Sequence, residues 1–361
     1  MVRIRTGWLV AVVALGALGF GAACKKNDEK KGDQPATADK AAEKTDKPAA
    51  DTGGAKPAAA GAAISGQAGD DLSLLPKDSE VVLGLNFAQL QQSALWKQYS
   101  PKLMDKMAGG LAEFQAACGF NPLEAIKSVA IGMKGLGGVP DGAIVIHGLE
   151  KAKLMANLDK CKAEAAKKGT EITVDGDVFM VKDKKGQSSA FTFVGDSTIV
   201  AVMGANGTKD GVLAAAKGDS ALKTSPAFVE MYGKIDTTQS LWMVMNGNSP
   251  VFKQLGAMGV KPKAVFGSIN LTDGLTIDMR MRVATADEAT SFANMMKPNL
   301  SNPQVKQMFD KLDVVTDGTD IKFSVGMSSA KLQQLAQMVG GMMGGMMGGG
   351  MGGGMGGMGT P

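Results

Sequence analysis

The stretch Glu80–Asn86, EVVLGLN, sets the plan of the chain, because its pattern returns 160 residues later in Ser240–Asn246, SLWMVMN. Each is a short run of apolar, strand-favouring residues that ends at an asparagine. Each therefore predicts a β-strand. Two matched strands so far apart suggest that the chain contains the same unit twice.

The segments that follow the two stretches support this interpretation, since hydrophobic periodicity predicts the same order after each: helix, two strands, helix, two strands. After the first stretch we expect helices over 87–99 and 103–118, broken at Pro101, and then a short helix over 123–126, strands over 128–133 and 142–147, a helix over 150–168 and strands over 171–174 and 178–181. The longer first unit continues with strands over 189–194 and 198–203 and a helix over 211–217. After the second stretch we expect a short helix over 250–258, strands over 263–271 and 275–283, a helix over 285–296 and strands over 313–316 and 320–325.

Turn chemistry marks the hairpins in both units. Asp-Gly pairs at 175, 273 and 317 are typical of tight turns between antiparallel strands, and none has the acidic pattern of an EF-hand calcium loop. Thr285 and Glu288 form a capping-box pattern at a helix start. We predict an α+β fold of two similar halves, 68–225 and 226–338. Each half is expected to be an antiparallel sheet with helices packed on one face, and the halves to lie side by side after a disordered N-terminal linker.

The N-terminus, residues 1–23, is typical of a secretory signal peptide. Arg3 and Arg5 precede an uncharged apolar run and the small residues Gly21-Ala22-Ala23. Cys24 follows directly, so the segment resembles a bacterial lipoprotein signal in which this cysteine is lipidated, although Gly21 stands where leucine is usual. The alternative is an ordinary signal cut after Ala23, with Cys24 incidental. The sorting rules that this resemblance implies favour the outer membrane, because Lys25 rather than aspartate follows the cysteine.

Low-complexity segments flank the two halves. Residues 24–67 contain no aromatic residue and almost no large aliphatic one, so they predict a disordered linker with a reach of roughly 35 Å. Residues 339–361 form a Gly/Met tail that cannot build a packed core. Its methionines at 342, 343, 346, 347, 351, 355 and 358 leave three interpretations: no selected role, an adaptable contact for a partner, or soft ligands for Cu(I).

The remaining cysteines, Cys118 and Cys161, favour one disulfide in an oxidising envelope, with two buried free thiols as the alternative. The only histidine, His147, stands at the end of a predicted strand, where a structural role is the simpler interpretation than a catalytic one. We therefore predict no catalytic residues, no metal site, no cofactor and no enzymatic activity. The formal charge of +4 is spread over interspersed residues without a basic, aromatic-rich stripe, which argues against nucleic acid as a partner.

Four short motifs add a resemblance: residues 75–78 (LPKD), 93–96 (SALW), 118–122 (CGFNP) and 129–132 (VAIG). Over about Leu74 to Leu335 the chain resembles an uncharacterised family of bacterial envelope lipoproteins found in myxobacteria and their relatives. We expect a lipid-anchored protein of the cell envelope, in the outer membrane facing the periplasm or the cell surface. Its expected role is non-enzymatic, either structural or in binding an envelope protein. The alternatives are a periplasmic carrier of a lipid or other apolar ligand and Cu(I) binding by the tail.

Overall fold

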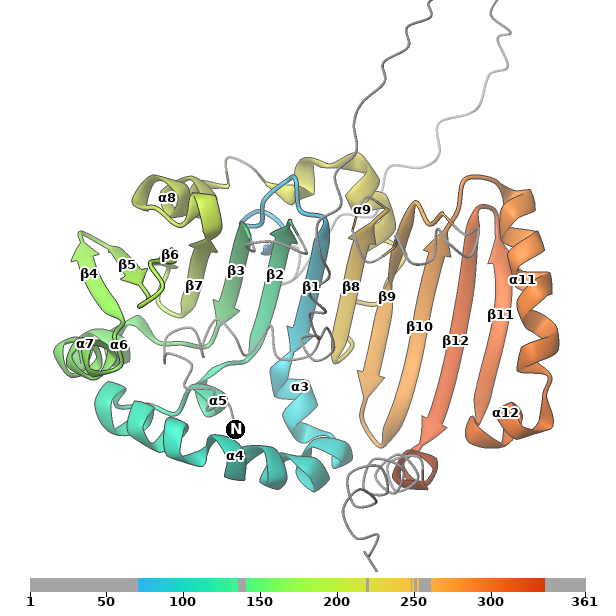
Figure 1. Cartoon of the computed structure of the whole chain (residues 1–361), viewed down its shortest axis with the longest axis horizontal. Helices are drawn as coiled ribbons and strands as arrows, with labels where there is room; N and C mark the ends of the chain where they lie inside the picture. Colours follow the sequence, from blue (N-terminus) through green and yellow to red (C-terminus); the bar gives the residue numbers. More distant parts are fainter. Residues whose placement is uncertain are drawn as a thin grey trace, which may run out of the picture.

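One continuous antiparallel sheet of twelve strands forms the body of the described chain (Figure 1). The computed structural model describes residues 71–135, 141–218, 221–247, 249, 252 and 261–334. The predicted α+β class is confirmed, with the strands of both halves joined in a single sheet. The first half contributes β1 (Val81–Asn86), β2 (Ser128–Lys134), β3 (Asp141–His147), β4 (Glu171–Asp175), β5 (Val178–Lys182), β6 (Ser188–Val194) and β7 (Thr198–Met203). The second half contributes β8 (Leu241–Asn246), β9 (Ala264–Leu271), β10 (Gly274–Arg282), β11 (Lys311–Asp317) and β12 (Asp320–Ser328).

The two matched strands meet at the centre of this sheet. β1 pairs antiparallel with β8, so that Val81 lies opposite Met245 and Leu85 opposite Leu241. Gly84 lies opposite Trp242, and a Cβ atom at Gly84 would come within 2.0 Å of the indole ring. A larger residue at this position would therefore have to displace the buried Trp242 indole.

Outward from this pair, both halves follow the same path. The sheet runs β1-β2-β3 on one side and β8-β9-β10 on the other. In each half the chain then crosses to the outer edge of the sheet and returns toward the centre. The second half returns through β11 and β12, whereas the first half returns through β4, β5, β6 and β7. The edge strands β4 and β11 correspond, but β12 takes the place of β7 rather than that of β5. The first half therefore has two additional strands, β5 and β6, within its return.

Helices cover both faces of the first half, unlike the single covered face that we predicted. On one face, Trp96 and Leu111 of α4 (Ala94–Cys118) pack on the cluster that contains Ile131 and Ile144. We call this the α4 face; α3 (Phe87–Gln92) and α5 (Pro122–Ala125) also lie there. On the opposite face, the α8 face, α8 (Lys209–Lys217) packs on a second cluster, to which α9 (Pro226–Tyr232) of the second half also belongs through its contacts with β8. The reason is that β2 and β3 carry apolar residues at successive positions, as strands buried on both faces do.

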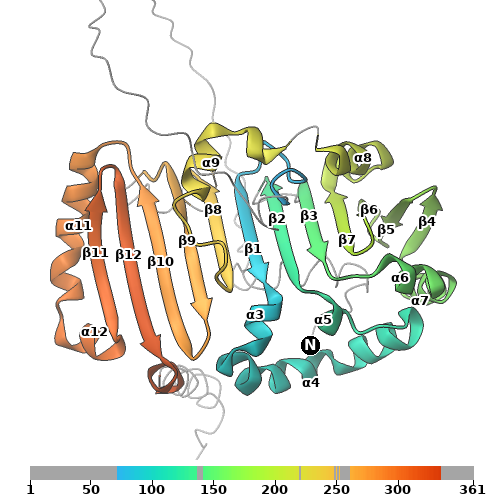
Figure 2. The ribbon, with the colours of Figure 1, turned by 180° about the vertical axis from the view of Figure 1, so that it is seen from behind.

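The second half has its long helix on the α4 face only (Figures 1 and 2). Ala289 and Ala293 of α11 (Ala286–Leu300) pack with Val314 and Ile321 of the outer strands. The predicted capping box begins this helix, since the Thr285 hydroxyl accepts from the Glu288 backbone N–H at 3.1 Å. A short helix that we did not predict, α12 (Pro303–Met308), follows, and α9 was missed as well.

An ion-pair network on the α8 face ties α9 to the strands of the second half. The Asp320 carboxylate is 1% exposed and lies 2.7 Å from Arg282 Nε and 3.0 Å from Lys234 Nζ. Arg282 also donates to both carboxylate oxygens of Glu230. Burial alone raises the pKa of Asp320, but hydrogen bonds from Arg282 and then Lys234 outweigh it and hold the pKa below its ordinary value. The network is therefore fully formed only when Asp320 is ionised.

Two helix boundaries differ from the prediction. The break expected at Pro101 lies at Ser93, whose backbone is extended and whose hydroxyl accepts from the Trp96 backbone N–H at 3.0 Å. This N-cap starts α4 early enough that Pro101 lies inside the helix despite its missing N–H donor. The single helix expected over 150–168 is divided at Asn157 into α6 (Lys151–Ala156) and α7 (Leu158–Lys167).

Candidate functional site

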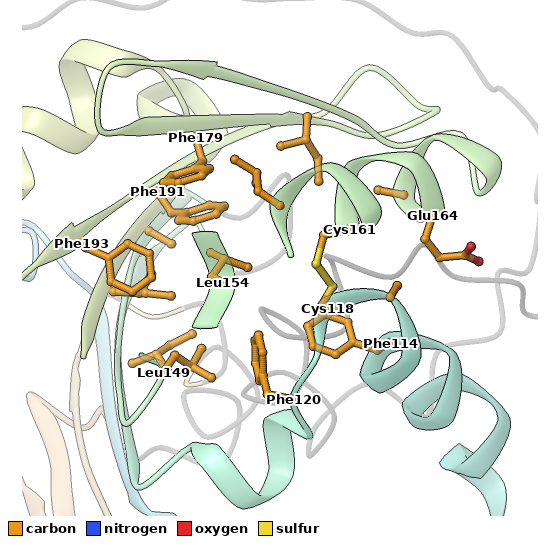
Figure 3. A pocket seen from close by; sticks show the side chains of 17 residues that line it. Phe114, Cys118, Phe120, Leu149, Leu154, Cys161, Glu164, Phe179, Phe191 and Phe193 are labelled. Carbon is orange, nitrogen blue, oxygen red and sulfur yellow. A yellow bond between two sulfur atoms is a disulfide. The ribbon is translucent and has the colours of Figure 1, made fainter. Parts of the chain in front are cut away.

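An apolar pocket lies on the α4 face of the first half, between the sheet and helices α4, α6 and α7 (Figure 3). Sixteen of its seventeen lining residues are apolar or cysteine, and Glu164 is the one charged side chain among them. The cavity measures about 80 Å³, within about 890 Å³ of space that is partly continuous with solvent. A mainly apolar lining with few polar groups is typical of sites that bind apolar molecules.

Aromatic side chains form the floor of the pocket. Phe179 on β5 and Phe191 on β6 are direct cross-strand partners, and their rings stack with centroids 4.6 Å apart. Phe193, two residues further along β6, meets Phe179 edge-on at 6.4 Å. Residues two apart on a strand share a face, which is why the three rings gather on one side of the sheet. All three stand on the two strands that the second half lacks.

A disulfide joins the two helices that roof the pocket. Cys118 at the end of α4 and Cys161 in α7 are bonded, with Cα atoms 5.0 Å apart, and both side chains are buried. Phe114 of α4 meets Phe120 edge-on at 5.3 Å beside this bond. Figure 3 shows the disulfide and both phenylalanines facing the aromatic floor. The cysteine pair expected from the sequence therefore lies in the wall of the pocket.

Charged side chains gather where α7 leaves the pocket. Glu164 lies 3.0 Å from Lys167 Nζ and 3.7 Å from Lys168 Nζ, and Lys168 also contacts Glu113 of α4. The hydrogen bond from Lys167 is the main cause that lowers the pKa of Glu164, so this carboxylate is ionised at neutral pH. An apolar group thus fits inside the pocket, and a polar group of the same ligand would meet charges at this rim.

His147 lies next to the pocket in sequence but on the other face of the sheet. Its neighbour Ile146 lines the pocket, whereas the imidazole lies on the α8 face, with Nε2 2.6 Å from Asp71 Oδ1 and Nδ1 3.0 Å from Thr198 Oγ1. Hydroxyl, imidazole and carboxylate follow one another, but the two ring nitrogens are exchanged relative to a nucleophilic triad, in which the hydroxyl contacts Nε2 and the carboxylate contacts Nδ1. The Asp71 and His147 side chains are only 5% and 12% exposed, so the chain of contacts fixes the first described residue to the end of β3.

Sequence reasoning found part of this region. It identified the cysteines and a helical segment over 150–168, and Leu154, Leu158 and Cys161 of this segment line the pocket. It missed the pocket itself and the Asp71 contact, because both depend on pairing between distant segments. Strict alternation of phenylalanine over 191–193 was the available signal for an aromatic floor. Cys24, the linker and the tail methionines lie outside the described residues.

Comparison with known proteins gives little further information. No protein-family model and no curated protein matches the sequence. Among solved structures, crystal forms III, I and IV of TP0453 are similar at 8%, 8% and 7% sequence identity, with TM-scores of 0.46, 0.44 and 0.47. Each match covers 72–73% of this chain and 95% of the other. A likeness of this strength carries no argument about function. Within the described residues, no helix has the length and apolarity needed to span a bilayer.

Proposed function

We propose that this chain is a lipid-anchored protein of the cell envelope that binds the apolar part of a lipid-like ligand in the pocket between β5–β7 and helices α4, α6 and α7. The observation that carries the proposal is the lining, in which Glu164 is the one charged residue among seventeen. The signal-like N-terminus and Cys24 support the location and the anchor.

The chemistry of the pocket favours a hydrocarbon chain over a polar molecule. Each methylene group moved from water into such a lining contributes about 0.8 kcal/mol. A polar molecule in the same place would lose its hydrogen bonds to water without gaining partners there. The ligand class is therefore an acyl or similar chain whose polar end stays at the rim formed by Glu164, Lys167 and Lys168.

The proposed role is binding rather than catalysis. The one histidine is engaged by Asp71 and Thr198 on the face opposite the pocket, so a ligand in the pocket does not reach it. Binding of an apolar ligand takes precedence over binding of a protein partner, because the lining residues belong to the packed interior of the first half.

A pair of substitutions on α4 tests the proposal. Ala117 lines the pocket, whereas its neighbour Ala116 is exposed on the same helix. We expect Ala117→Phe to fill part of the pocket and to weaken the binding of the fluorescent apolar probe N-phenyl-1-naphthylamine at least tenfold. The measurement is fluorescence titration of the unlipidated chain carrying Cys24→Ser.

Ala116→Phe is the matched control, since it adds the same ring to the same helix outside the pocket. It should leave probe affinity unchanged, and both variants should keep the circular dichroism of the parent chain. Equal affinity of the two variants, or the lack of saturable binding by the parent chain, would refute the proposal. Native mass spectrometry of the protein released from its own membranes would then give the mass of the natural ligand.

A further inference from the structure

The second half carries a strip of apolar side chains that no described helix covers. Met243 and Met245 of β8, Ile269 of β9, Ile277 and Met279 of β10 and Val325 of β12 are all half-buried, and none belongs to a core cluster of the described residues. Their strand registers place all six on the α4 face. We call these six residues the open strip.

The open strip lies between two covered regions of the same face. On one side α3 contacts β2, and on the other α11 contacts β11 and β12. In the two opposite views of Figures 1 and 2, no described helix crosses the middle of β9 and β10. A contiguous apolar area on a sheet face is normally covered by another segment or partner.

The C-terminal segment of this chain begins at the rim of the open strip. After β12, Lys331 Nζ donates to the Phe309 carbonyl at 2.7 Å, and Gln333 Nε2 donates to Gln98 Oε1 of α4 at 3.3 Å. The chain therefore runs from the end of β12 toward α4, past the ends of the strands between them. Residues 335–361 continue from this point.

The composition of this segment matches the open strip. Residues 335–361 contain eight methionines and no charged side chain. This segment can therefore pack on an apolar surface without the free-energy cost of removing a charged side chain from water. Methionine is flexible and polarizable, and it adapts to irregular apolar surfaces such as one that already carries Met243, Met245 and Met279. A Gly-rich segment of this length spans roughly 29 Å as a coil, close to the roughly 30 Å length of a nine-residue strand such as β10.

We infer that the Gly/Met tail folds back across the α4 face of the second half and covers the open strip with its methionine side chains. The occupant is thus part of the same molecule. This interaction is independent of the ligand pocket, which lies in the first half and shares no residue with the open strip.

The test compares the full chain with a variant of equal length in which the seven methionines at 342, 343, 346, 347, 351, 355 and 358 are serine. With methyl-labelled methionine, the NMR signals of Met243, Met245 and Met279 should shift between the two proteins. The signal of Met155, which is 44% exposed on α6 in the first half, should not move. Unchanged signals of the three strip methionines would overturn the inference.

A second measurement separates one molecule from two. Photo-methionine cross-linking of a mixture of light and isotope-labelled protein should give tail-to-strand cross-links of uniform isotope composition. Mixed light–heavy cross-links would overturn the inference in favour of a tail that binds a neighbouring copy. The absence of any tail-to-strand cross-link would overturn it as well.

Discussion

The two halves of the sheet start from the same strand pattern and end with different interiors. The second half returns from its edge through two strands, and it has one long helix on one face. The first half inserts β5 and β6 into the same return, covers both faces and joins two roof helices by a disulfide. The three aromatic residues of the pocket floor stand on the inserted strands. In this molecule, therefore, a two-strand insertion in one copy of a repeated plan accounts for the pocket.

The two halves also hold their helices against the sheet by different kinds of interaction. A helical layer is attached covalently in the first half, through Cys118 and Cys161. In the second half the α9 segment is attached electrostatically, through Glu230 to Arg282 and through Lys234 to Asp320. A covalent attachment responds to reduction and an ionic one responds to pH.

The largest expected change in the free energy of unfolding comes from removing the disulfide. Replacing both cysteines, Cys118→Ser with Cys161→Ser, should lower the free energy of unfolding by about 4 kcal/mol, as loop closure over 43 residues of sequence separation implies. Urea unfolding monitored by tryptophan fluorescence measures this change. Reduction of the parent chain should have the same effect, because the described part of the second half contains no cysteine. A change below 1 kcal/mol would mean that α7 packing alone holds the roof.

The ionic attachment should be the next most costly to break. Asp320→Asn should lower the free energy of unfolding by about 2–3 kcal/mol at pH 7, because it removes charge-assisted hydrogen bonds from Arg282 and Lys234. Asp273→Asn, in an exposed turn of the same half, is the control and should change it little.

The pH dependence of the stability difference between the parent chain and Asp320→Asn tests whether the attachment is ionic. The pKa of Asp320 is lowered in the folded protein, so its contribution is complete above the unfolded-state pKa of about 3.9 and is lost as the pH falls through the folded-state pKa. The gap between parent and Asp320→Asn should therefore narrow as the pH falls from 5 to 3. A gap that stays constant over this range would contradict an ionic attachment.

A smaller change in the free energy of unfolding is expected from a substitution in the β1–β8 pair, where the halves join. Gly84→Ala should lower the free energy of unfolding by about 2 kcal/mol, because the new methyl group displaces the buried Trp242 indole. Gly109→Ala, on an open part of α4 with no neighbouring atom within 4 Å, should instead raise it by about 1 kcal/mol. Thermal unfolding of the two variants measures the opposite signs. Equal behaviour would mean that Trp242 adjusts freely and that the β1–β8 pairing does not depend on close contact.

The sequence was sufficient for features that depend on neighbouring residues. Alternation and Asp-Gly turns placed the strand ends within three residues, and the Thr285 capping box was predicted correctly. It was insufficient where segments distant in the chain meet. The pairing of β1 with β8, the insertion of β5 and β6 between β4 and β7 and the Asp71–His147 contact all join residues that no local pattern connects. The pocket depends on several of these pairings at once, so only its cysteines and the helical segment over 150–168 were predicted.

The smallest expected effect separates two signals that compete in the sequence, the cap at Ser93 and the break expected at Pro101. Ser93 is 4% exposed, its hydroxyl donates to the Leu90 carbonyl at 2.7 Å, and it accepts from the Trp96 N–H. Ser93→Ala should lower the free energy of unfolding by about 1 kcal/mol, as the loss of an N-cap does. Thr285→Ala, at the equivalent cap of α11, should cost a similar amount and is the matched variant. If urea unfolding shows the cost for Thr285→Ala alone, α4 does not start at Ser93, and the helix that roofs the pocket begins beyond Pro101 as its sequence alone suggests.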